Sequence, residues 1–212
     1  MRKIYLMSGP SRDGKFNEDI KIELEKDLIN CRNCAFIPTS FQNYERNDSY
    51  ADLIFNSLKE FTPISDYKII DNKLTNEEKI KTLENCDIIY LLGGNPSEQL
   101  KNIYDYNLSE YIKKFTGIII GTSAGAMNLA SVAYYSKDED CNKSYFYKGL
   151  GLVDITIDPH FDINNEIQVS EAKKFSSEHE IIGLPNTSAI IISDGEVKYV
   201  GDFFRFYKGN II

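Results

Sequence analysis

The stretch GTSAG, from Gly121 to Gly125, places a serine between two glycines directly after the apolar run GIII. This G-x-S-x-G spacing is typical of a nucleophile on a tight strand-to-helix turn, where side chains two positions from the serine would collide. A helix that begins after Ser123 would direct its N–H groups and the positive end of its dipole at the site, which favours an oxyanion. The segment therefore predicts a serine nucleophile, with a tightly packed structural turn as the alternative.

A serine hydroxyl needs a general base, and the chain has only two histidines. His160, in ITIDPHFD, follows a strand-like run, and loops at strand ends present the reactive groups of parallel sheets. His179, in SSEHEII, stands at the polar end of a predicted helix and is typical of a solvated terminus. We therefore expect His160 to accept the serine proton, with a partly buried structural histidine as the other interpretation.

The third member of such a site is a carboxylate that orients the imidazole. The candidates form two clusters, Asp138, Glu139 and Asp140 in SKDED, and Asp158 and Asp162 on either side of His160. Most members of the first cluster are expected to lie on a solvated charged surface. The spacing alone does not choose among these carboxylates.

A second oxyanion donor is predicted in YLLGGNPSEQL. The strand-like run DIIYLL ends at Gly93 and Gly94, and a helix is predicted after Pro96. Glycines at such a position let a backbone N–H approach a substrate oxygen closely. The alternative is a turn that needs only positive φ, and a phosphate site is disfavoured because no G-x-G-x-x-G or G-x-x-x-x-G-K-[ST] follows.

Short apolar runs alternate with amphipathic stretches over the first two thirds of the chain. Strands are predicted at 3–8, 34–38, 67–70, 87–93 and 117–122, and helices at 18–29, 50–60, 77–85 and 98–114, the last broken near Asn107. This alternation is typical of a parallel sheet with helices on both faces. The sequence therefore predicts an α/β fold that positions the serine and both glycines at the carboxyl ends of strands.

The last third has a different character. Residues 131–149 are polar and aromatic, as expected for a functional loop or hairpin, and a strand at 152–158 and a helix at 163–176 follow. Residues 179–209 are strand-rich, with a hairpin turn at SDGE. Because no repeat or long linker divides the chain, we expect a single domain over residues 1–212.

Composition excludes several classes of partner. The net charge of -8 and the pI near 4.9 argue against nucleic acid and anionic membranes, which attract clustered Lys and Arg. No segment approaches the roughly 18 apolar residues of a membrane span, and the apolar run in MRKIYLMSGP is too short for a signal peptide. A cytoplasmic protein is the expectation.

The chain has four cysteines: Cys31, Cys34, Cys86 and Cys141. The cysteine spacing in CRNC is compatible with a metal site, but the chain has neither a second close cysteine pair nor a suitably spaced histidine pair that could supply the other ligands. A redox C-x-x-C usually opens a helix, whereas this one closes a predicted helix. We therefore expect reduced thiols and no metal.

Four segments together resemble the aspartyl dipeptidase (dipeptidase E) and cyanophycinase-like family of serine peptidases. They are YLLGGN, GTSAGAMNLA, GLGLVDITIDPHFD and GLPNTSAIII. The resemblance covers most of the chain and is loosest in the first 60 residues. It implies a flavodoxin-like, doubly wound, mostly parallel sheet, related to class I glutamine amidotransferase domains with serine in place of their cysteine. It also implies a metal-independent peptidase that needs no cofactor.

The same resemblance implies roles for individual residues. The nucleophile falls on Ser123, the base on His160, and the acid on Asp138, while the backbone N–H groups of Gly94 and Ala124 become the oxyanion donors. The aspartyl dipeptidases carry an arginine between serine and acid. This chain has only Lys137 in that stretch.

The expected function is hydrolysis of short peptides, as by a dipeptidase, through a Ser-His-Asp triad and an acyl-enzyme. Two alternatives stay open, an esterase with the same order of triad residues and a catalytically silent binding protein on an amidotransferase-like scaffold. The expected partner is a short peptide, neither nucleic acid nor membrane, and a homodimer is left open.

Overall fold

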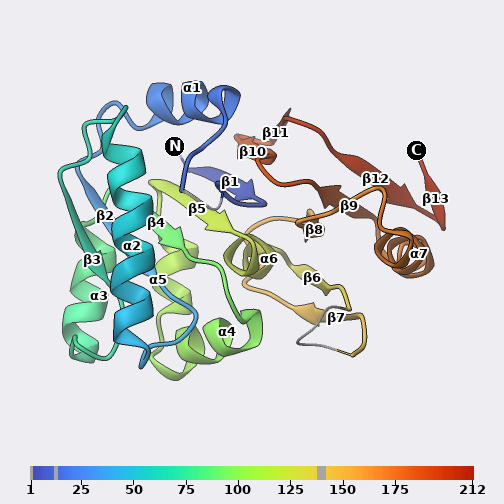
Figure 1. Ribbon diagram of the computed structural model, residues 1–212. Helices are drawn as coiled ribbons and strands as arrows, with labels where there is room; N and C mark the ends of the chain where they lie inside the picture. The colour runs from blue at the N-terminus through green and yellow to red at the C-terminus, as the bar shows by residue number, and fades with distance from the viewer. Residues whose placement is uncertain (1, 12–13, 138–141) are drawn as a thin grey trace.

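A seven-stranded sheet forms the centre of the computed structural model, which describes residues 2–11, 14–137 and 142–212. Its order is β11-β10-β1-β5-β4-β2-β3 (Figure 1). The parallel strands are β1 (Lys3–Met7), β5 (Ile118–Thr122), β4 (Ile88–Leu91), β2 (Asn33–Ile37) and β3 (Asp66–Ile69). The antiparallel pair β10 (Ala189–Ser193) and β11 (Glu196–Val200) extends the sheet beyond β1. The predicted α/β class with a mostly parallel sheet is confirmed.

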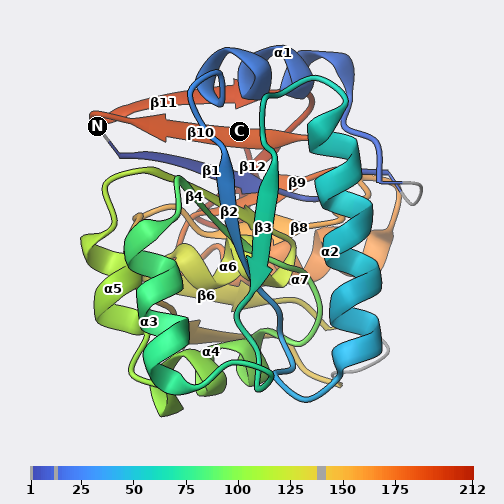
Figure 2. The same cartoon turned by 90° about the vertical axis from the view of Figure 1, so that its left-hand side faces the viewer.

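Helices cover both faces of this sheet, because successive apolar side chains of a buried strand point to opposite sides. Tyr5 and Met7 pack in a cluster with α1 (Glu18–Asp27) and α2 (Tyr44–Lys59). Ile4 and Leu6 pack in a second cluster with α3 (Asn76–Asn85), α4 (Pro96–Asp105), α5 (Ser109–Lys114) and α6 (Ala124–Leu129). Figure 2 shows the sheet from its β3 edge, with α2 and α3 on opposite sides.

The helix predicted at 50–60 begins earlier than expected, at Tyr44. Its first turns are polar, so apolar periodicity did not indicate them. Asn43 caps the helix by accepting from the Arg46 N–H, and the buried Asn47 amide donates to the Ser40 carbonyl and to Asp71. Side-chain hydrogen bonds therefore hold the amino-terminal end of α2.

The predicted break near Asn107 is confirmed. α4 ends at Asp105 and α5 begins at Ser109, and Asn107 between them has a φ of 56°. Asparagine is one of the few residues that enters this left-handed region readily, so the break is encoded locally.

The carboxyl-terminal part forms a second sheet in the order β13-β12-β9-β8, with α7 (Glu166–Phe175) against it. Its strands are β8 (Ile157–Pro159), β9 (Ile181–Leu184), β12 (Phe204–Tyr207) and β13 (Asn210–Ile211). Residues 131–149 contain the hairpin of β6 (Val132–Tyr135) and β7 (Tyr145–Lys148). Figure 1 shows these elements at the right, away from the β2–β3 end of the central sheet, where α2 and α3 lie.

The strand predicted at 152–158 is wrong over its first half. Only Ile157–Pro159 pair with β9, and upstream Val153 forms an isolated bridge to Ala130. The hairpin at SDGE is confirmed, because Asp194 and Gly195 both have positive φ, at 51° and 82°, as a tight two-residue turn requires. No helix among the described residues is long and apolar enough to cross a membrane.

Three cysteines are free thiols, and Cys141 lies outside the described residues. Burial raises the pKa of Cys31 to about 11 and that of Cys86 to about 12, and it raises the pKa of Cys34 well above its ordinary value. These thiols are therefore protonated and poorly nucleophilic at neutral pH. Within the described part of the chain, no group of three potential ligands could hold a metal ion.

Gly125 lets α6 pack directly against β4. A Cβ at this position would lie 2.2 Å from the Leu91 carbonyl oxygen. We therefore expect Gly125→Ala to lower the free energy of unfolding by about 2–3 kcal/mol, the usual cost of overpacking. Urea denaturation followed by circular dichroism measures the change.

Gly195→Ala is the matched control for this prediction. No atom lies within 4 Å of a Cβ there, but φ is +82°, so the cost should be only about 1 kcal/mol from backbone strain. Equal losses in the two variants would contradict the steric argument.

Candidate active site

Ser123 stands on a strained turn between β5 and α6. Its φ of 52° and ψ of -116° are rare for a residue with a side chain, and such conformations concentrate at functional sites. The Ser123 N–H donates to the Met7 carbonyl at 2.9 Å, which anchors the turn to β1. A Cβ at Gly121 would lie 2.6 Å from the Ala126 Cα, so the turn needs glycine two residues before the serine. The sharp elbow predicted from GTSAG is present.

His160 lies beside this serine although β8 belongs to the second sheet. The distance from its Nε2 to the Ser123 Oγ is 2.9 Å, within the range expected for a nucleophile and its base. The His160 backbone also has positive φ, at 58°, and its N–H donates to the buried Ser8 hydroxyl at 2.7 Å. Two strained loops from different sheets therefore bring the two side chains together.

The other ring nitrogen of His160 contacts Asn186, a residue that the sequence did not single out. Its Nδ1 lies 2.6 Å from the Asn186 Oδ1. The side-chain amide belongs to the turn after β9, where Ser188 N donates to the Pro185 carbonyl and Thr187 has a φ of 65°. A β-branched residue with this φ is a genuine outlier, so strain marks this loop as well.

Two of the carboxylates considered as triad acids have other hydrogen-bond partners in the structure. Asp158 is buried, and its Oδ1 accepts from the Ser136 hydroxyl at 2.8 Å. Asp162 accepts from the backbone and side chain of Asn164. Asp138, Glu139 and Asp140 lie outside the described residues, so the role expected for Asp138 stays a prediction.

The loop between β4 and α4, in which the sequence predicts an oxyanion donor, lies against the serine elbow. A Cβ at Gly93 would lie 3.4 Å from the Ser123 Cβ. Gly94 has a φ of +135°, and a Cβ there would lie 2.6 Å from the Thr39 hydroxyl oxygen. Within the described residues neither the Gly94 N–H nor the Ala124 N–H donates to an acceptor, so both are available to a ligand.

A buried amide network fixes the position of this loop. The Asn128 Nδ2 donates to the Pro96 carbonyl at 3.0 Å and to the Gln99 Oε1 at 2.9 Å. Gln99 in turn donates to the carbonyls of Ile37 and Leu92. Because Asn128 lies on α6 and Gln99 on α4, the network couples the serine elbow to the glycine loop.

Two small cavities meet at Ser123 and His160. One, of about 200 Å³, is also lined by Ser8, Gly9, Arg46 and Tyr50. The other, of about 90 Å³, is also lined by Ala124, Met127, Tyr135 and Pro159. Gly94 borders both. Larger hollows elsewhere on the surface contain neither Ser123 nor His160. His179, the second histidine, is exposed and stacks edge-on against Phe146, as a solvated terminus would.

Comparison with known proteins decides the family. The model of peptidase family S51 matches residues 4–200. The chain belongs to this family. It is therefore a serine-type peptidase, and the resemblance to the dipeptidase E family is confirmed.

Solved structures agree with the fold of an S51 peptidase. A peptidase from an acI-B1 Actinobacterium superposes with a TM-score of 0.73 and is 17% identical, with 100% of this chain and 96% of that chain covered. A protein from Listeria monocytogenes EGD-e assigned as a peptidase E superposes with a TM-score of 0.70 and is 22% identical, with coverages of 94% and 98%. A search of the curated proteins finds no match.

Proposed function

We propose that this S51 peptidase hydrolyses short peptides through an acyl-enzyme, with Ser123 as nucleophile and His160 as general base. The observation that carries the proposal is the 2.9 Å contact between the Ser123 Oγ and the His160 Nε2, made by a serine in a strained backbone conformation. A base at this distance can remove the hydroxyl proton as the oxygen attacks.

In the first half of the reaction, the Ser123 oxygen adds to the scissile carbonyl and His160 accepts its proton. The carbonyl oxygen becomes an oxyanion that accepts hydrogen bonds from the N–H groups of Gly94 and Ala124. His160 then gives the proton to the leaving nitrogen, the C–N bond breaks, and an ester of Ser123 remains. Water hydrolyses this ester in the second half, with His160 again as the base.

Asn186 is assigned the orienting role in this mechanism. A neutral imidazole has one N–H, and the Asn186 Oδ1 accepts it from Nδ1, which leaves Nε2 free to accept from Ser123. The expected triad acid, Asp138, would compete for the same Nδ1–H. The proposed site is therefore Ser-His-Asn, with no charge on the third member.

The size of the cavities supports a short substrate. Their volumes, about 200 and about 90 Å³, lie below the range that is usual for drug-sized ligands. We therefore expect each cavity to hold about one substrate residue, with one cavity on each side of the scissile bond. Tyr135, on the hairpin after α6, borders the smaller cavity and restricts its extension.

Fluorophosphonate labelling tests the proposal directly. Mass spectrometry should show one adduct on the wild-type protein and none on Ser123→Ala, because the activated oxygen displaces fluoride from phosphorus. In parallel, a dipeptide library should release amino acids with the wild type only. Hydrolysis of matched esters but of no amide would favour an esterase.

Absence of both adduct and cleavage in a folded wild-type protein would contradict the proposal. The Ser123 elbow would then be inactive, and a binding protein on the peptidase fold would be the better interpretation. An adduct that persists in Ser123→Ala would place the nucleophile on another residue.

A further inference from the structure

The larger catalytic cavity contains a positive charge that the peptide-cleaving mechanism does not use. Arg46 and Tyr50 line it together with Ser123 and His160. The two residues are four apart on α2, so they lie on the same face of the helix. Both come from the part of α2 that faces the carboxyl ends of the strands.

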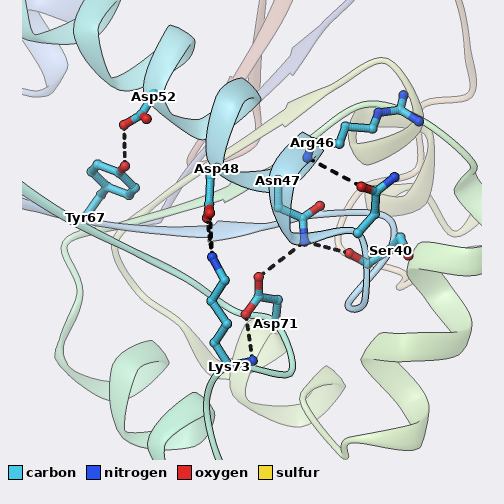
Figure 3. Close-up of polar contacts among 9 residues, drawn as sticks. Ser40, Arg46, Asn47, Asp48, Asp52, Tyr67, Asp71 and Lys73 are labelled. Atoms are coloured by element: carbon cyan, nitrogen blue, oxygen red, sulfur yellow. Dashed lines mark hydrogen bonds and ion pairs between the residues drawn. The ribbon is translucent and has the colours of Figure 1, made fainter.

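The amino-terminal end of α2 is held firmly, which fixes the starting point of the Arg46 side chain. Its backbone N–H donates to the Asn43 cap, and the next residue, Asn47, is buried and donates to Ser40 and Asp71. Figure 3 shows this cluster, with the Arg46 side chain directed away from it. The helix therefore presents the guanidinium outward from a rigid support.

No carboxylate neutralises Arg46 within the described residues. The nearby acidic groups have other partners, because Asp48 pairs with the Lys73 ammonium at 2.6 Å and Asp71 accepts from the Lys73 N–H and from Asn47. The chain as a whole has a net charge of -8. An arginine that no carboxylate of the described residues neutralises, in the catalytic cavity of such an acidic protein, is suited to an anionic ligand.

Tyr50 supplies a second donor beside this charge. Burial raises the pKa of its hydroxyl, and the neighbouring Arg46 charge opposes the rise only in part. The hydroxyl therefore stays protonated at neutral pH and can donate to an oxygen. A planar guanidinium and a phenol hydroxyl on one helix face form a binding surface for a carboxylate.

We propose that Arg46, assisted by Tyr50, is a specificity-determining residue that binds the C-terminal carboxylate of the substrate. The inference rests on the proposed peptidase reaction of Ser123. A carboxylate site at Arg46 would select free dipeptides, because the carboxyl carbon of a dipeptide is only two bonds from the leaving nitrogen.

Both cavities border His160, and the leaving residue is assigned to the one with Arg46. The imidazole must protonate the leaving nitrogen, so the residue that departs lies on its side of Ser123. The cavity with Arg46 extends along the imidazole, since a Cβ at Gly9 would lie 3.7 Å from the His160 Cε1. The smaller cavity, bordered by Met127, Tyr135 and Pro159, contains no arginine or lysine and is left for the residue that forms the acyl-enzyme.

Binding to the inactive Ser123→Ala protein tests this assignment without requiring turnover. Isothermal titration calorimetry would compare a panel of free dipeptides Xaa-Ala with their C-terminal amides, and aspartyl-alanine amide would test an acidic side chain as the carboxylate source. The variants would be Ser123→Ala alone and combined with Arg46→Gln, Arg46→Lys or Lys59→Met. Lys59, on the same helix but outside the cavity, controls for loss of positive charge.

We expect Arg46→Gln to weaken binding of the best free dipeptide about 10- to 100-fold and to leave its amide unaffected. Arg46→Lys should recover part of the loss, because lysine keeps the charge but not the two parallel N–H groups. Lys59→Met should change neither.

Equal weakening of acid and amide would overturn the proposal, as would the failure of every free dipeptide to bind. An effect of Arg46 on aspartyl-alanine amide alone would overturn the assignment to the C-terminal carboxylate. The outcome is separate from that of the fluorophosphonate experiment. Arg46-dependent binding without any Ser123 adduct would contradict the peptidase mechanism and leave the carboxylate site standing.

Discussion

Replacement of Ser123 by alanine should lower kcat/KM for the best dipeptide by about 10⁴- to 10⁶-fold, because the attacking oxygen is lost and His160 has nothing to activate. Residual turnover would come from binding and from the N–H groups of Gly94 and Ala124. Steady-state kinetics with the substrate from the library measures the ratio. Ser57→Ala, at a half-buried position of α2 outside both cavities, is the matched control and should retain full activity.

The stability of variants at this position separates loss of chemistry from loss of fold. Ser123→Ala keeps the strained φ of 52° and should leave the free energy of unfolding nearly unchanged. Ser123→Gly should raise it by about 1 kcal/mol, because glycine tolerates this conformation. An inactive Ser123→Gly that is also less stable than wild type would contradict the view that strain is kept here for function.

Much of this site could be predicted because its signals are local. The elbow depends on glycines two residues from Ser123, and steric collision makes that spacing visible in the sequence. His160 could be selected because the chain has only one other histidine. The parallel sheet followed from apolar runs such as GIIIG, which are buried on both faces.

Other features could not be predicted because they depend on contacts between distant segments. Asn186 reaches His160 from a turn 26 residues away, and an asparagine in such a turn usually indicates only turn geometry. Arg46 enters the cavity because α2 begins at Tyr44, and that polar first turn is stabilised by Asn47 and Asp71 rather than by apolar periodicity. The strand predicted at 152–158 was too long for a related reason, since only β9 determines how much of it pairs.

The second large loss of activity is expected on substitution of Asn186. In the proposed mechanism its Oδ1 accepts the Nδ1–H of His160, and the Asn17 amide holds the turn by donating to the Thr187 carbonyl at 2.6 Å. Asn186→Ala should therefore lower kcat/KM about 100-fold, because the imidazole loses its orientation and can place its proton on Nε2. Asn56→Ala, an exposed position on α2, is the control and should have no effect.

Asn186→Asp distinguishes an orienting role from a merely structural one. The carboxylate keeps the hydrogen bond to Nδ1 and adds a negative charge that stabilises the protonated imidazole. The proton then leaves at higher pH, so the acid limb of the kcat/KM profile should move upward by about one pH unit. Activity above that limb should approach the wild-type value. An unshifted profile would show that Asn186 does not contact the catalytic imidazole.

The pair of variants Asn186→Ala and Asp138→Asn decides which residue orients His160. The imidazole has one Nδ1–H, so the side chain that accepts it should dominate the loss of activity, and removal of the other should cost little. We expect Asn186→Ala to be the more damaging change, with Asp138→Asn within a few-fold of wild type. A large loss in Asp138→Asn, with an active Asn186→Ala, would restore the Ser-His-Asp triad, and the contact at 2.6 Å between His160 and Asn186 would then be a resting arrangement that the substrate displaces.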